Sequence, residues 1–255
     1  MNSELDALKS LRQLTPSRVR LGSNQGIANT QQVLDLQMAH AQAKDAILLP
    51  LQSELLKRNL VEREIVEVRS KAFDRSEYLR RPDLGRCLDL QTFPNQLEGP
   101  FDVVFVIGDG LSATAVERHA APVLSAVIQQ LDGWSVAPIF IATQARVALA
   151  DDIGERLNAL FTVMMIGERP GLTVSDSMGL YLTIAPRKGT PDSSRNCISN
   201  IHGNGGLSHQ AAADKLVWLM QQAKHLGCTG IALKDDMPST LLDQNVELLP
   251  RKDFE

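Results

Sequence analysis

The stretch DVVFVIGDGLSA, residues 102–113, decides the fold. Its first part is a short apolar run rich in β-branched residues, which is typical of a strand buried on both faces of a sheet. The glycines of GDG end that run, and Ser112 is placed to cap a helix that continues to about residue 131. A buried strand that turns directly into a helix indicates an α/β protein.

The same alternation continues towards the C-terminus. Further strands are expected at 136–143, 161–166, 179–186 and 231–234, and further helices at 145–160 and 209–226. The last helix has a cap at Ser208 and a glycine stop at Gly227. Strands that alternate with helices of this length predict a mostly parallel sheet with helices on both faces.

The first part of the chain has a different pattern. Asn29 fits the N-cap of a helix over 32–49, and residues 53–72 predict a second helix. Residues 80–100 are rich in Pro, Gly and polar side chains and indicate a connector. We therefore expect a small all-helical domain at residues 1–97 and an α/β domain at residues 98–255.

Composition excludes several classes of protein. The chain has 255 residues, a formal net charge of -4 and a pI near 5.8, which argues against a nucleic-acid partner. No apolar stretch approaches the roughly 18 residues of a membrane span. The N-terminus carries acidic residues and no apolar core typical of a secretory signal. Three cysteines are too few for a disulfide framework, so we expect reduced thiols and a cytoplasmic location.

The GDGLSA loop also matches the G-x-G-x-x-A fingerprint of dinucleotide-binding proteins. An NAD-dependent oxidoreductase is therefore the alternative function. Two features disfavour it: Asp109 would repel a pyrophosphate, and the next strand ends in IATQ without an acidic residue for a ribose. The competing interpretation is a glycine-rich turn in which Asp109 or Ser112 caps the helix.

The segment GERPG, residues 167–171, places Glu168 and Arg169 directly after a buried strand. Ligands of open α/β sheets bind outside the carboxyl ends of the strands. The loops GDGLSA, ATQARV and GERPG each follow one strand, so we expect them to meet at one edge of the sheet. A ligand or a partner is expected there, although a solvated turn would explain the same residues.

Residues 194–208, SRNCISNIHGNGGLS, form a polar, glycine-rich stretch that is expected to be a loop. The spacing of Cys197, His202, His209 and Cys228 does not match paired metal ligands, so no metal site is expected. Cys197 has no local signature of a catalytic nucleophile, and no catalytic residue is assigned to the chain. A small packing residue is the alternative interpretation of Cys197.

Several stretches between about Arg18 and Asp235 occur in a characteristic order: RVRLG, HAQAKDAIL, YLRRPDLGR, DVVFVIGDGLSATAV, IGERPGL, DSMGLYLT, RNCISNI and GLSHQAAADKL. In this order they resemble the small (light) subunit of ethanolamine ammonia-lyase, an adenosylcobalamin-dependent enzyme. The resemblance covers most of the chain. It implies a helical N-terminal part followed by a Rossmann-like domain.

The resemblance also implies a division of labour. The large subunit would bind ethanolamine and convert it to acetaldehyde and ammonia, and cobalamin would lie between the two chains. Radical chemistry would belong to the cofactor, and this chain would supply binding and orientation. Some complexes of this family are packaged in a bacterial microcompartment, so that location is a second expectation.

The family's cofactor contacts carry over to three positions of this chain: Val147 in ARVALAD, Glu168 in GERPG and Cys197 in RNCISN. Glu168 would accept hydrogen bonds from the peripheral amides of cobalamin, and Val147 would give apolar contact. Cys197 would be a close neighbour rather than a metal ligand. Two regions depart from the family: the loop SNQGIANTQ, which is usually more basic, and the short N-terminus.

Overall fold

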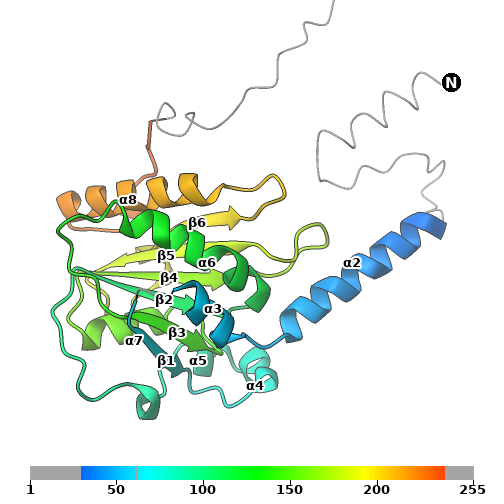
Figure 1. The fold of residues 1–255 in the computed structure, drawn as a ribbon, viewed down its shortest axis with the longest axis horizontal. Coiled ribbons are helices and arrows are strands. Elements are labelled where there is room, and N and C mark those ends of the chain that lie inside the picture. Colours follow the sequence, from blue (N-terminus) through cyan, green and yellow to red (C-terminus); the bar gives the residue numbers. More distant parts are fainter. Residues whose placement is uncertain (1–29, 61–62, 239–255) are drawn as a thin grey trace, which may run out of the picture.

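A computed structural model describes residues 30–60 and 63–238 of the chain (Figure 1). Its strands belong to one six-stranded sheet. The strands are β1 Ile65–Arg69, β2 Val103–Gly108, β3 Ile139–Thr143, β4 Phe161–Gly167, β5 Met178–Ile184 and β6 Asn196–Ile201. The α-helices are α2 Thr30–Leu48, α3 Ser53–Asn59, α4 Arg75–Arg80, α5 Pro82–Gly85, α6 Ala113–Ile128, α7 Leu149–Arg156 and α8 His209–Leu226. Short 3-10 turns occupy Leu90–Thr92 (η2), Asp192–Ser194 (η3) and Gly230–Ala232 (η4).

The sheet has the strand order β1-β3-β2-β4-β5-β6. The first four strands in this order are parallel, and β5 and β6 extend the sheet as antiparallel strands. β2 and β4 are buried along their whole length, as their continuous apolar runs predict. The protein is therefore of the α/β class with a mixed sheet.

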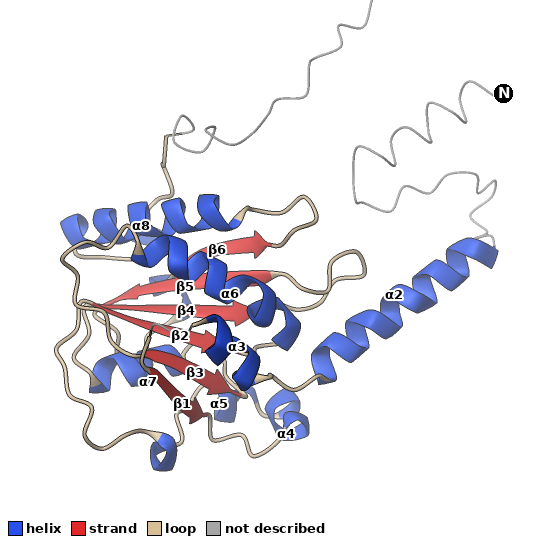
Figure 2. Cartoon of the chain, viewed as in Figure 1, coloured by secondary structure: helices blue, strands red, loops and turns tan. Residues whose placement is uncertain are grey.

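Helices cover both faces of the sheet (Figure 2). α3, α6 and α8 pack against one face, over Phe105, Ile107 and Phe161. α7 packs against the other face, over Phe140 and Met164. The chain thus leaves β2 towards one face and β3 towards the other. In such sheets the point where the connections diverge is a usual place for a ligand.

The predicted caps of α6 and α8 are confirmed, whereas the helix predicted over 145–160 is shorter, because α7 covers only Leu149–Arg156. The Ser112 hydroxyl accepts a hydrogen bond from the Ala115 N–H at 3.3 Å, which caps α6. Ser208 caps α8 in the same way through the Ala211 N–H. Gly227 ends α8 in the left-handed conformation, with φ of 70°, which glycine adopts without steric cost.

The helix predicted over residues 53–72 is wrong in its second half. α3 ends at Asn59, and Ile65–Arg69 form β1, which pairs in parallel with β3. The alternation and the β-branched side chains of IVEVR favour a strand once β3 offers an open edge. The description of residues 1–97 as all-helical is therefore wrong for β1, which belongs to the sheet.

Two further expectations near the C-terminus are corrected. The polar stretch after Arg195 is not a loop throughout, because Asn196–Ile201 form edge strand β6, in which only Ile198 and Ile201 are buried. The strand predicted at 231–234 is absent: the chain there forms η4 and a loop. The Asn196 side chain holds that turn, accepting from the Gly230 N–H and donating to the Leu233 carbonyl.

Helix α2 extends away from the sheet (Figure 1). Ala39, Ala43 and Ala46 are its buried residues, and its last turn is tied to α4 because the Arg75 Nε–H donates to the Ile47 carbonyl at 2.7 Å. The predicted cap at Asn29 lies outside the described residues. The loop SNQGIANTQ lies before this helix and also outside the described residues, apart from its last residues, which begin α2.

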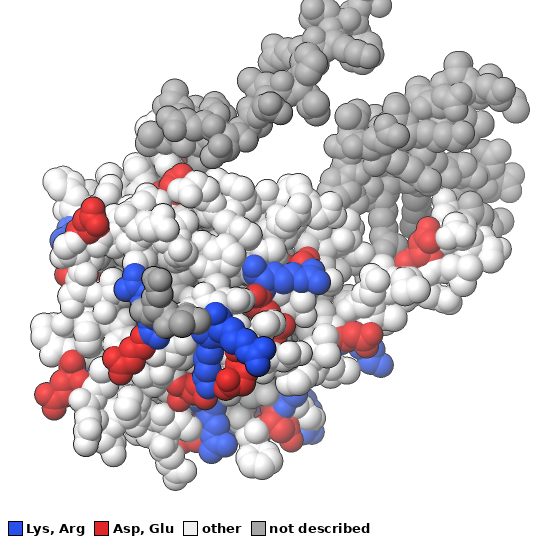
Figure 3. Space-filling model, viewed as in Figure 1, with Lys and Arg blue, Asp and Glu red and all other residues white. Residues whose placement is uncertain are grey.

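Acidic and basic side chains are intermixed on the face of the molecule in Figure 3. That face shows no basic stripe of the kind that follows a nucleic-acid backbone. Within residues 30–60 and 63–238, no helix has both the length and the apolar character needed to cross a bilayer.

Candidate functional site

The loops that follow β2, β3 and β4 meet at the carboxyl edge of the parallel strands, as predicted. The Asp109 carboxylate accepts hydrogen bonds from the backbone N–H groups of Gln144 and Ala145, both at 2.9 Å. The Leu111 N–H donates to the Gly167 carbonyl at 2.9 Å. These bonds join the three loops into one surface.

The GDGLSA loop is packed closely against the loop that follows β4. A Cβ on Gly110 would lie 2.2 Å from the Gly167 carbonyl oxygen, and one on Gly167 would lie 2.0 Å from the Ser112 carbonyl oxygen. These glycines therefore permit close contact between two loops. The Asp109 side chain fills the crevice between β2 and β3. Burial raises the pKa of this carboxyl group, with the backbone N–H of Ala145 and the Arg75 guanidinium opposing the shift.

Next to this edge, a hollow of about 410 Å³ brings two of the three predicted contact residues together. Val147 enters it from the loop before α7, and Cys197 from β6. Its lining consists of Pro82, Arg86, Arg146, Val147, Ala148, Tyr181, Asp192, Arg195 and Cys197. The Cys197 side chain is exposed, so a ligand in the hollow could reach the thiol.

Glu168 lies beside the hollow and is not part of its lining. Its Oε2 accepts from the Ser177 hydroxyl at 2.5 Å and from the Asn200 N–H at 3.3 Å. Its Oε1 lies over Gly179, where a Cβ would be only 2.9 Å away. Within the described residues this Oε1 has no hydrogen-bond donor, so it can accept from a ligand.

Strand β5 links the three positions. Gly179, Tyr181 and Thr183 alternate along β5 and so share one of its faces. Gly179 leaves space for Glu168, and Tyr181 is the direct cross-strand partner of Cys197. Tyr181 also packs in the same apolar cluster as Val147. The predicted residues therefore surround one open face of β5, although they come from three different segments.

A buried ion pair fixes the rear of the hollow. Arg195 donates through Nη1 to Asp151 at 2.5 Å and to the Thr183 hydroxyl at 3.1 Å. Its other nitrogens donate to the Thr190 carbonyl at 2.7 Å and to Asp192 at 3.3 Å. Asp151 lies on the first turn of α7, and Arg195 directly precedes β6, so this pair ties the start of α7, next to Val147, to the strand that carries Cys197.

Burial determines the protonation of the groups around the hollow. It raises the pKa of Asp151 to about 6, although the Arg195 guanidinium opposes this shift. It also raises the pKa of the Tyr181 hydroxyl, with a further contribution from Cys197. The protein atoms around the sulfur raise the pKa of the Cys197 thiol by partial desolvation, although the residue is exposed, so this group is protonated near neutral pH and is a poor metal ligand.

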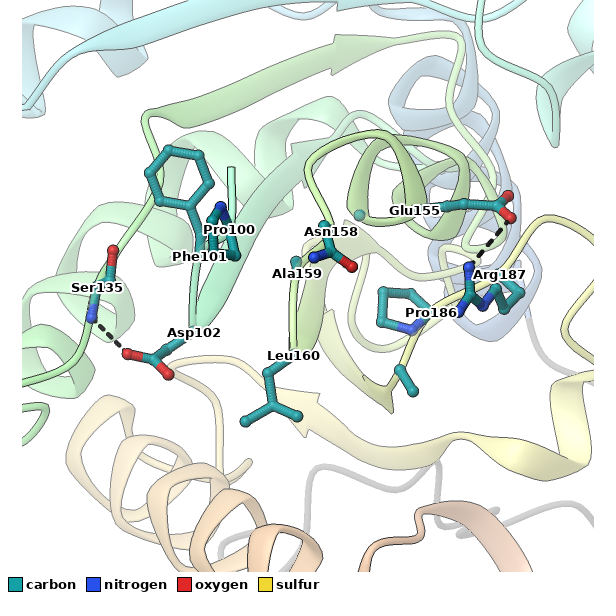
Figure 4. Close-up of a pocket in the computed structure, with 12 residues that line it drawn as sticks. Pro100, Phe101, Asp102, Ser135, Glu155, Asn158, Ala159, Leu160, Pro186 and Arg187 are labelled. Atoms are coloured by element: carbon teal, nitrogen blue, oxygen red, sulfur yellow. Dashed lines mark hydrogen bonds and ion pairs between the residues drawn. The ribbon is translucent and has the colours of Figure 1, made fainter. Parts of the chain in front are cut away.

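A second hollow, of about 480 Å³, lies at the opposite edge of the sheet (Figure 4). It adjoins Asp102 and Leu160, which directly precede β2 and β4. The Ser135 N–H donates to Asp102 at 2.8 Å, and Arg187 lies 3.7 Å from Glu155 (Figure 4). None of the three predicted contact residues lines this hollow, so it is separate from the predicted site.

Within the described part of the chain, no group of three or more His, Cys, Asp or Glu side chains is arranged to hold a metal ion. His119 and His209 do form a pair, with Nδ1 of the first 2.9 Å from Nε2 of the second. This pair joins α6 to α8 on the other face of the sheet from α7, away from the hollow.

Sequence reasoning did not identify Arg86, Arg146, Tyr181 or Asp192 as residues of the site. Three of these lie in separate connecting segments that only the folded chain brings together. Tyr181 had a detectable signal. The alternation of Gly179, Tyr181 and Thr183 gives β5 one polar face, which is unusual for a strand in the interior of a sheet.

Comparisons with known proteins point to one family. A family model described as "Ethanolamine ammonia-lyase light chain (EutC)" matches residues 5–234. The ethanolamine ammonia-lyase small subunit of Azotobacter vinelandii is 46% identical over 245 residues, which is 92% of this chain and 90% of that protein. The small subunit of Pseudomonas aeruginosa is 45% identical over 243 residues, covering 91% and 89%. That of Ralstonia nicotianae is 45% identical over 245 residues, covering 92% and 90%.

Proposed function

The chain belongs to the ethanolamine ammonia-lyase light-chain family, and from that premise we propose that it forms one wall of an adenosylcobalamin site. It is thus a component of a lyase complex. A larger subunit would close the site, bind ethanolamine and carry out its conversion to acetaldehyde and ammonia. Val147, Glu168 and Cys197 are the contacts that we propose for this chain.

One observation carries the proposal. Val147 and Cys197 line the same hollow, and Glu168 presents a carboxylate oxygen beside it, over Gly179. These positions are far apart in the sequence and belong to three different loops or strands. A hollow of this volume is in the range of small-molecule sites. A cofactor as large as cobalamin would occupy it with part of its periphery only.

The groups around the hollow fit the periphery of cobalamin, which carries amides and one phosphodiester. Amides offer both donors and acceptors. Glu168 Oε1 has no donor within the described residues and would accept from an amide N–H. Arg146 lines the hollow without a carboxylate partner among the described residues, and its guanidinium would donate to an oxygen of the ligand. Val147 would give apolar contact.

Adenosylcobalamin, when bound, supplies the radical chemistry of the reaction. The residues of this chain hold and orient it. Glu168 fixes one side of the periphery by accepting hydrogen bonds, and the Val147 side chain excludes water from the neighbouring edge. Cys197 provides a neutral thiol, because burial raises the pKa of that group.

The NAD-dependent alternative has no support from the family match or from the relatives. The packing of Gly110 against Gly167 and the position of Asp109 in the crevice also argue against it. A titration with NADH would test this directly, and we expect no binding.

Cysteine protection in the reconstituted two-subunit complex tests the proposed site. Cys197 is exposed in this chain, whereas Cys87 and Cys228 are half-buried and lie outside the hollow. Saturating cyanocobalamin should slow the alkylation of Cys197 by a maleimide about tenfold or more, and should leave Cys87 and Cys228 unaffected as internal controls. The modified peptides would be quantified by mass spectrometry.

A second measurement covers the case in which the partner already shields Cys197. Cys197→Phe should fill the hollow and weaken cyanocobalamin binding by at least about tenfold, while the exposed position tolerates the larger ring without loss of fold. Equal alkylation with and without cofactor, together with unchanged affinity of Cys197→Phe, would refute the proposed site.

Several finer expectations accompany this proposal. A Rossmann-like arrangement is supported by the four parallel strands and by helices on both faces.

The division into residues 1–97 and 98–255 would be tested by expressing the second part alone. We expect that fragment to be less stable than the chain, because it lacks β1. A cytoplasmic complex packaged in a microcompartment rests on the family resemblance, and co-purification with shell proteins would test it.

A further inference from the structure

The side chains that line the hollow have a positive net charge, although the net charge of the whole chain is negative. Its lining contains Arg86, Arg146 and Arg195 but only one carboxylate, Asp192, whereas the chain has a net charge of -4. Arg195 is neutralised from behind by the buried Asp151. The remaining carboxylate, Asp192, is shared, because it accepts from both Arg86 and Arg195.

Of the three arginines in the lining, Arg146 is the one without a carboxylate partner among the described residues. Its guanidinium stacks on the Tyr78 ring at 4.5 Å and donates through Nη2 to the Tyr78 carbonyl at 3.3 Å. Its Nε is buried and has no acceptor. A guanidinium that lines a hollow without a carboxylate partner favours a ligand that brings negative charge beside it.

The side chain of Arg146 is held in a fixed position. A Cβ on Gly85 would lie 2.8 Å from its Cγ, so the glycine makes room for the arginine stem. The Arg146 N–H donates to the Gly85 carbonyl at 2.8 Å. Together with the Tyr78 ring, these contacts orient the guanidinium in advance, which reduces the entropy lost on binding.

Arg86 follows α5 and lines the hollow together with Arg146. Its Nη2 donates to both oxygens of Asp192, at 2.8 and 2.9 Å, and within the described residues its Nε and Nη1 have no acceptor. Its side chain is 46% exposed, so it can reach a bound ligand. The two arginines therefore line one hollow, Arg86 with N–H groups that have no acceptor among the described residues and Arg146 with a guanidinium charge that no carboxylate there compensates.

We infer that Arg86 and Arg146 bind the phosphodiester of the cobalamin nucleotide loop. The inference rests on the proposed function. Peripheral amides of cobalamin are neutral, and the phosphodiester is the anion that its periphery offers to an uncompensated cation. Guanidinium groups match phosphate oxygens in both charge and geometry. The nucleotide end of the cofactor would thus lie in the hollow, with the amides of the ring edge directed towards Glu168.

The experiment compares two ligands on the reconstituted complex. Cyanocobalamin contains the phosphodiester, and dicyanocobinamide lacks both the phosphodiester and the nucleotide. Arg86→Gln and Arg146→Gln should each weaken cyanocobalamin binding about tenfold, as expected for a charge-assisted hydrogen bond. Neither should change dicyanocobinamide binding by more than about twofold. Arg81→Gln is the matched control, because Arg81 pairs with Asp83 on the surface.

Thermal melting of each variant complex would establish whether Arg146→Gln retains its fold. Arg86 is at an exposed position, so Arg86→Gln tests phosphodiester binding even if Arg146→Gln is unstable. Equal losses for both ligands, or no loss for either, would overturn the inference. The variant Cys197→Phe separates this result from a failure of the proposed function. If it weakens both ligands while the arginine variants weaken neither, only the phosphodiester assignment fails. If it also leaves both affinities unchanged, the proposed cofactor site itself fails.

Discussion

The two oxygens of the Glu168 carboxylate face different groups. Its Oε2 accepts from Ser177 and Asn200 within the chain, and its Oε1 is open above Gly179. A carboxylate can serve both sides because it only accepts. An amide at this position would have to direct its oxygen to one side and its NH₂ group to the other.

Glu168→Gln should therefore weaken cyanocobalamin binding to the reconstituted complex by about tenfold. The internal donors would retain the amide oxygen, and the NH₂ group would face the ligand's own N–H donors. A charge-assisted hydrogen bond contributes about 1.5–3 kcal/mol and a neutral one about 1, which accounts for the size of the loss. Glu168→Ala should weaken binding further, because the acceptor is removed altogether. Affinity would be measured by titration.

The matched control is Glu155→Gln at the opposite edge of the sheet, where Glu155 accepts from the Lys188 N–H and faces Arg187. This change should leave affinity unaltered. Thermal melting should show a small effect for Glu168→Gln, since Ser177 keeps an acceptor. Affinity equal to that of the unmodified complex in both Glu168 variants would mean that the carboxylate serves the turn alone.

The pair of Asp151 and Arg195 is the second residue-scale feature with a measurable consequence. Both side chains are almost completely buried, at 1% and 2% exposure. Removing one member of a buried pair leaves the other charge without compensation. Arg195→Gln should therefore lower the free energy of unfolding by about 3–5 kcal/mol, measured by urea denaturation, because the Asp151 carboxylate would stay buried without its guanidinium partner.

Asp83→Asn is the control for that prediction. Asp83 accepts two hydrogen bonds from Arg81, at 2.9 and 2.7 Å, but both side chains are more than half exposed. Pairs of this kind contribute little because water screens them. The denaturation midpoint of Asp83→Asn should be unchanged. A similar small effect for Arg195→Gln would show that the buried pair contributes no more than a surface pair.

At the scale of elements, helices α6 and α8 meet through His119 and His209. Burial lowers the pKa of His119 below its ordinary value of 6.5, and the neighbouring His209 adds to the effect, whereas Asp176 opposes it. Arg118 and Asp176 are the other charged groups beside this contact. The folded chain therefore binds fewer protons here than the unfolded chain.

The sign of the pH dependence follows from this difference. Above about pH 6.5, His119 is neutral in the folded chain and its contribution to the free energy of unfolding is fully present. This contribution is lost as the pH falls through the lower pKa of His119 in the folded chain. Asp151 acts in the opposite direction, because a raised carboxyl pKa destabilises the folded chain most above about pH 6. The comparison must therefore isolate His119.

His119→Gln provides that comparison. Between pH 7.5 and 5.5, the unmodified chain should lose stability relative to His119→Gln, measured from urea midpoints at each pH. His40→Gln, at an exposed position on α2, should run parallel to the unmodified chain. A constant difference between the unmodified chain and His119→Gln at all pH values would exclude His119 as the source.

The elements that sequence patterns predicted correctly lie in the middle of the sheet. β2, β3 and β4 are continuous apolar runs because both of their faces are covered, and this pattern is visible in the sequence alone. α6 and α8 carried cap residues that fixed their first turns. For these elements local pattern and final environment agree.

The errors lie at the two edges of the sheet. β1 buries only Val68 among its five residues, and its charges at Glu67 and Arg69 resemble those of an exposed helix. β6 buries only Ile198 and Ile201 and otherwise has the composition of a loop. An edge strand exists because a neighbouring strand offers its backbone groups. That neighbour is distant in the sequence, so a local pattern cannot predict it.

The candidate site shows the same limit. Val147, Glu168 and Cys197 followed from the family resemblance, and the loops of the parallel strands followed from topology. Arg86 and Arg146 did not, because their role depends on a hollow between α5, the loop before α7, and the strands β5 and β6. Only the folded chain brings these segments together.

At the scale of the whole molecule, the chain exposes apolar surface that a self-sufficient protein would cover. Helix α2 leaves Leu34 53% and Met38 62% exposed, and its buried positions are small alanines. Phe73, before α4, is 82% exposed. The hollow is likewise open on one side. Large exposed apolar side chains on neighbouring elements are typical of a surface that a partner covers.

The isolated chain should therefore show no lyase turnover. Its hollow offers no free general base: Asp192 is paired with Arg86 and Arg195, and the raised pKa of Tyr181 and of Cys197 keeps both groups protonated near neutral pH. One wall of a cofactor site also cannot exclude water from the reaction. Ammonia release would be measured with ethanolamine and adenosylcobalamin, for this chain alone and after addition of the large subunit. The reconstituted complex is the positive control.

The isolated chain should also self-associate at high concentration, since the described residues leave Leu34 and Met38 of α2, and Phe73, exposed. Light scattering would detect this, and Met38→Glu should reduce it, because a charge among the exposed apolar side chains of α2 disfavours apolar association.

Ethanolamine turnover by the chain without a partner would contradict the division of labour between subunits. A monodisperse monomer at high concentration would show that the exposed apolar side chains of α2 are tolerated in water and need no partner.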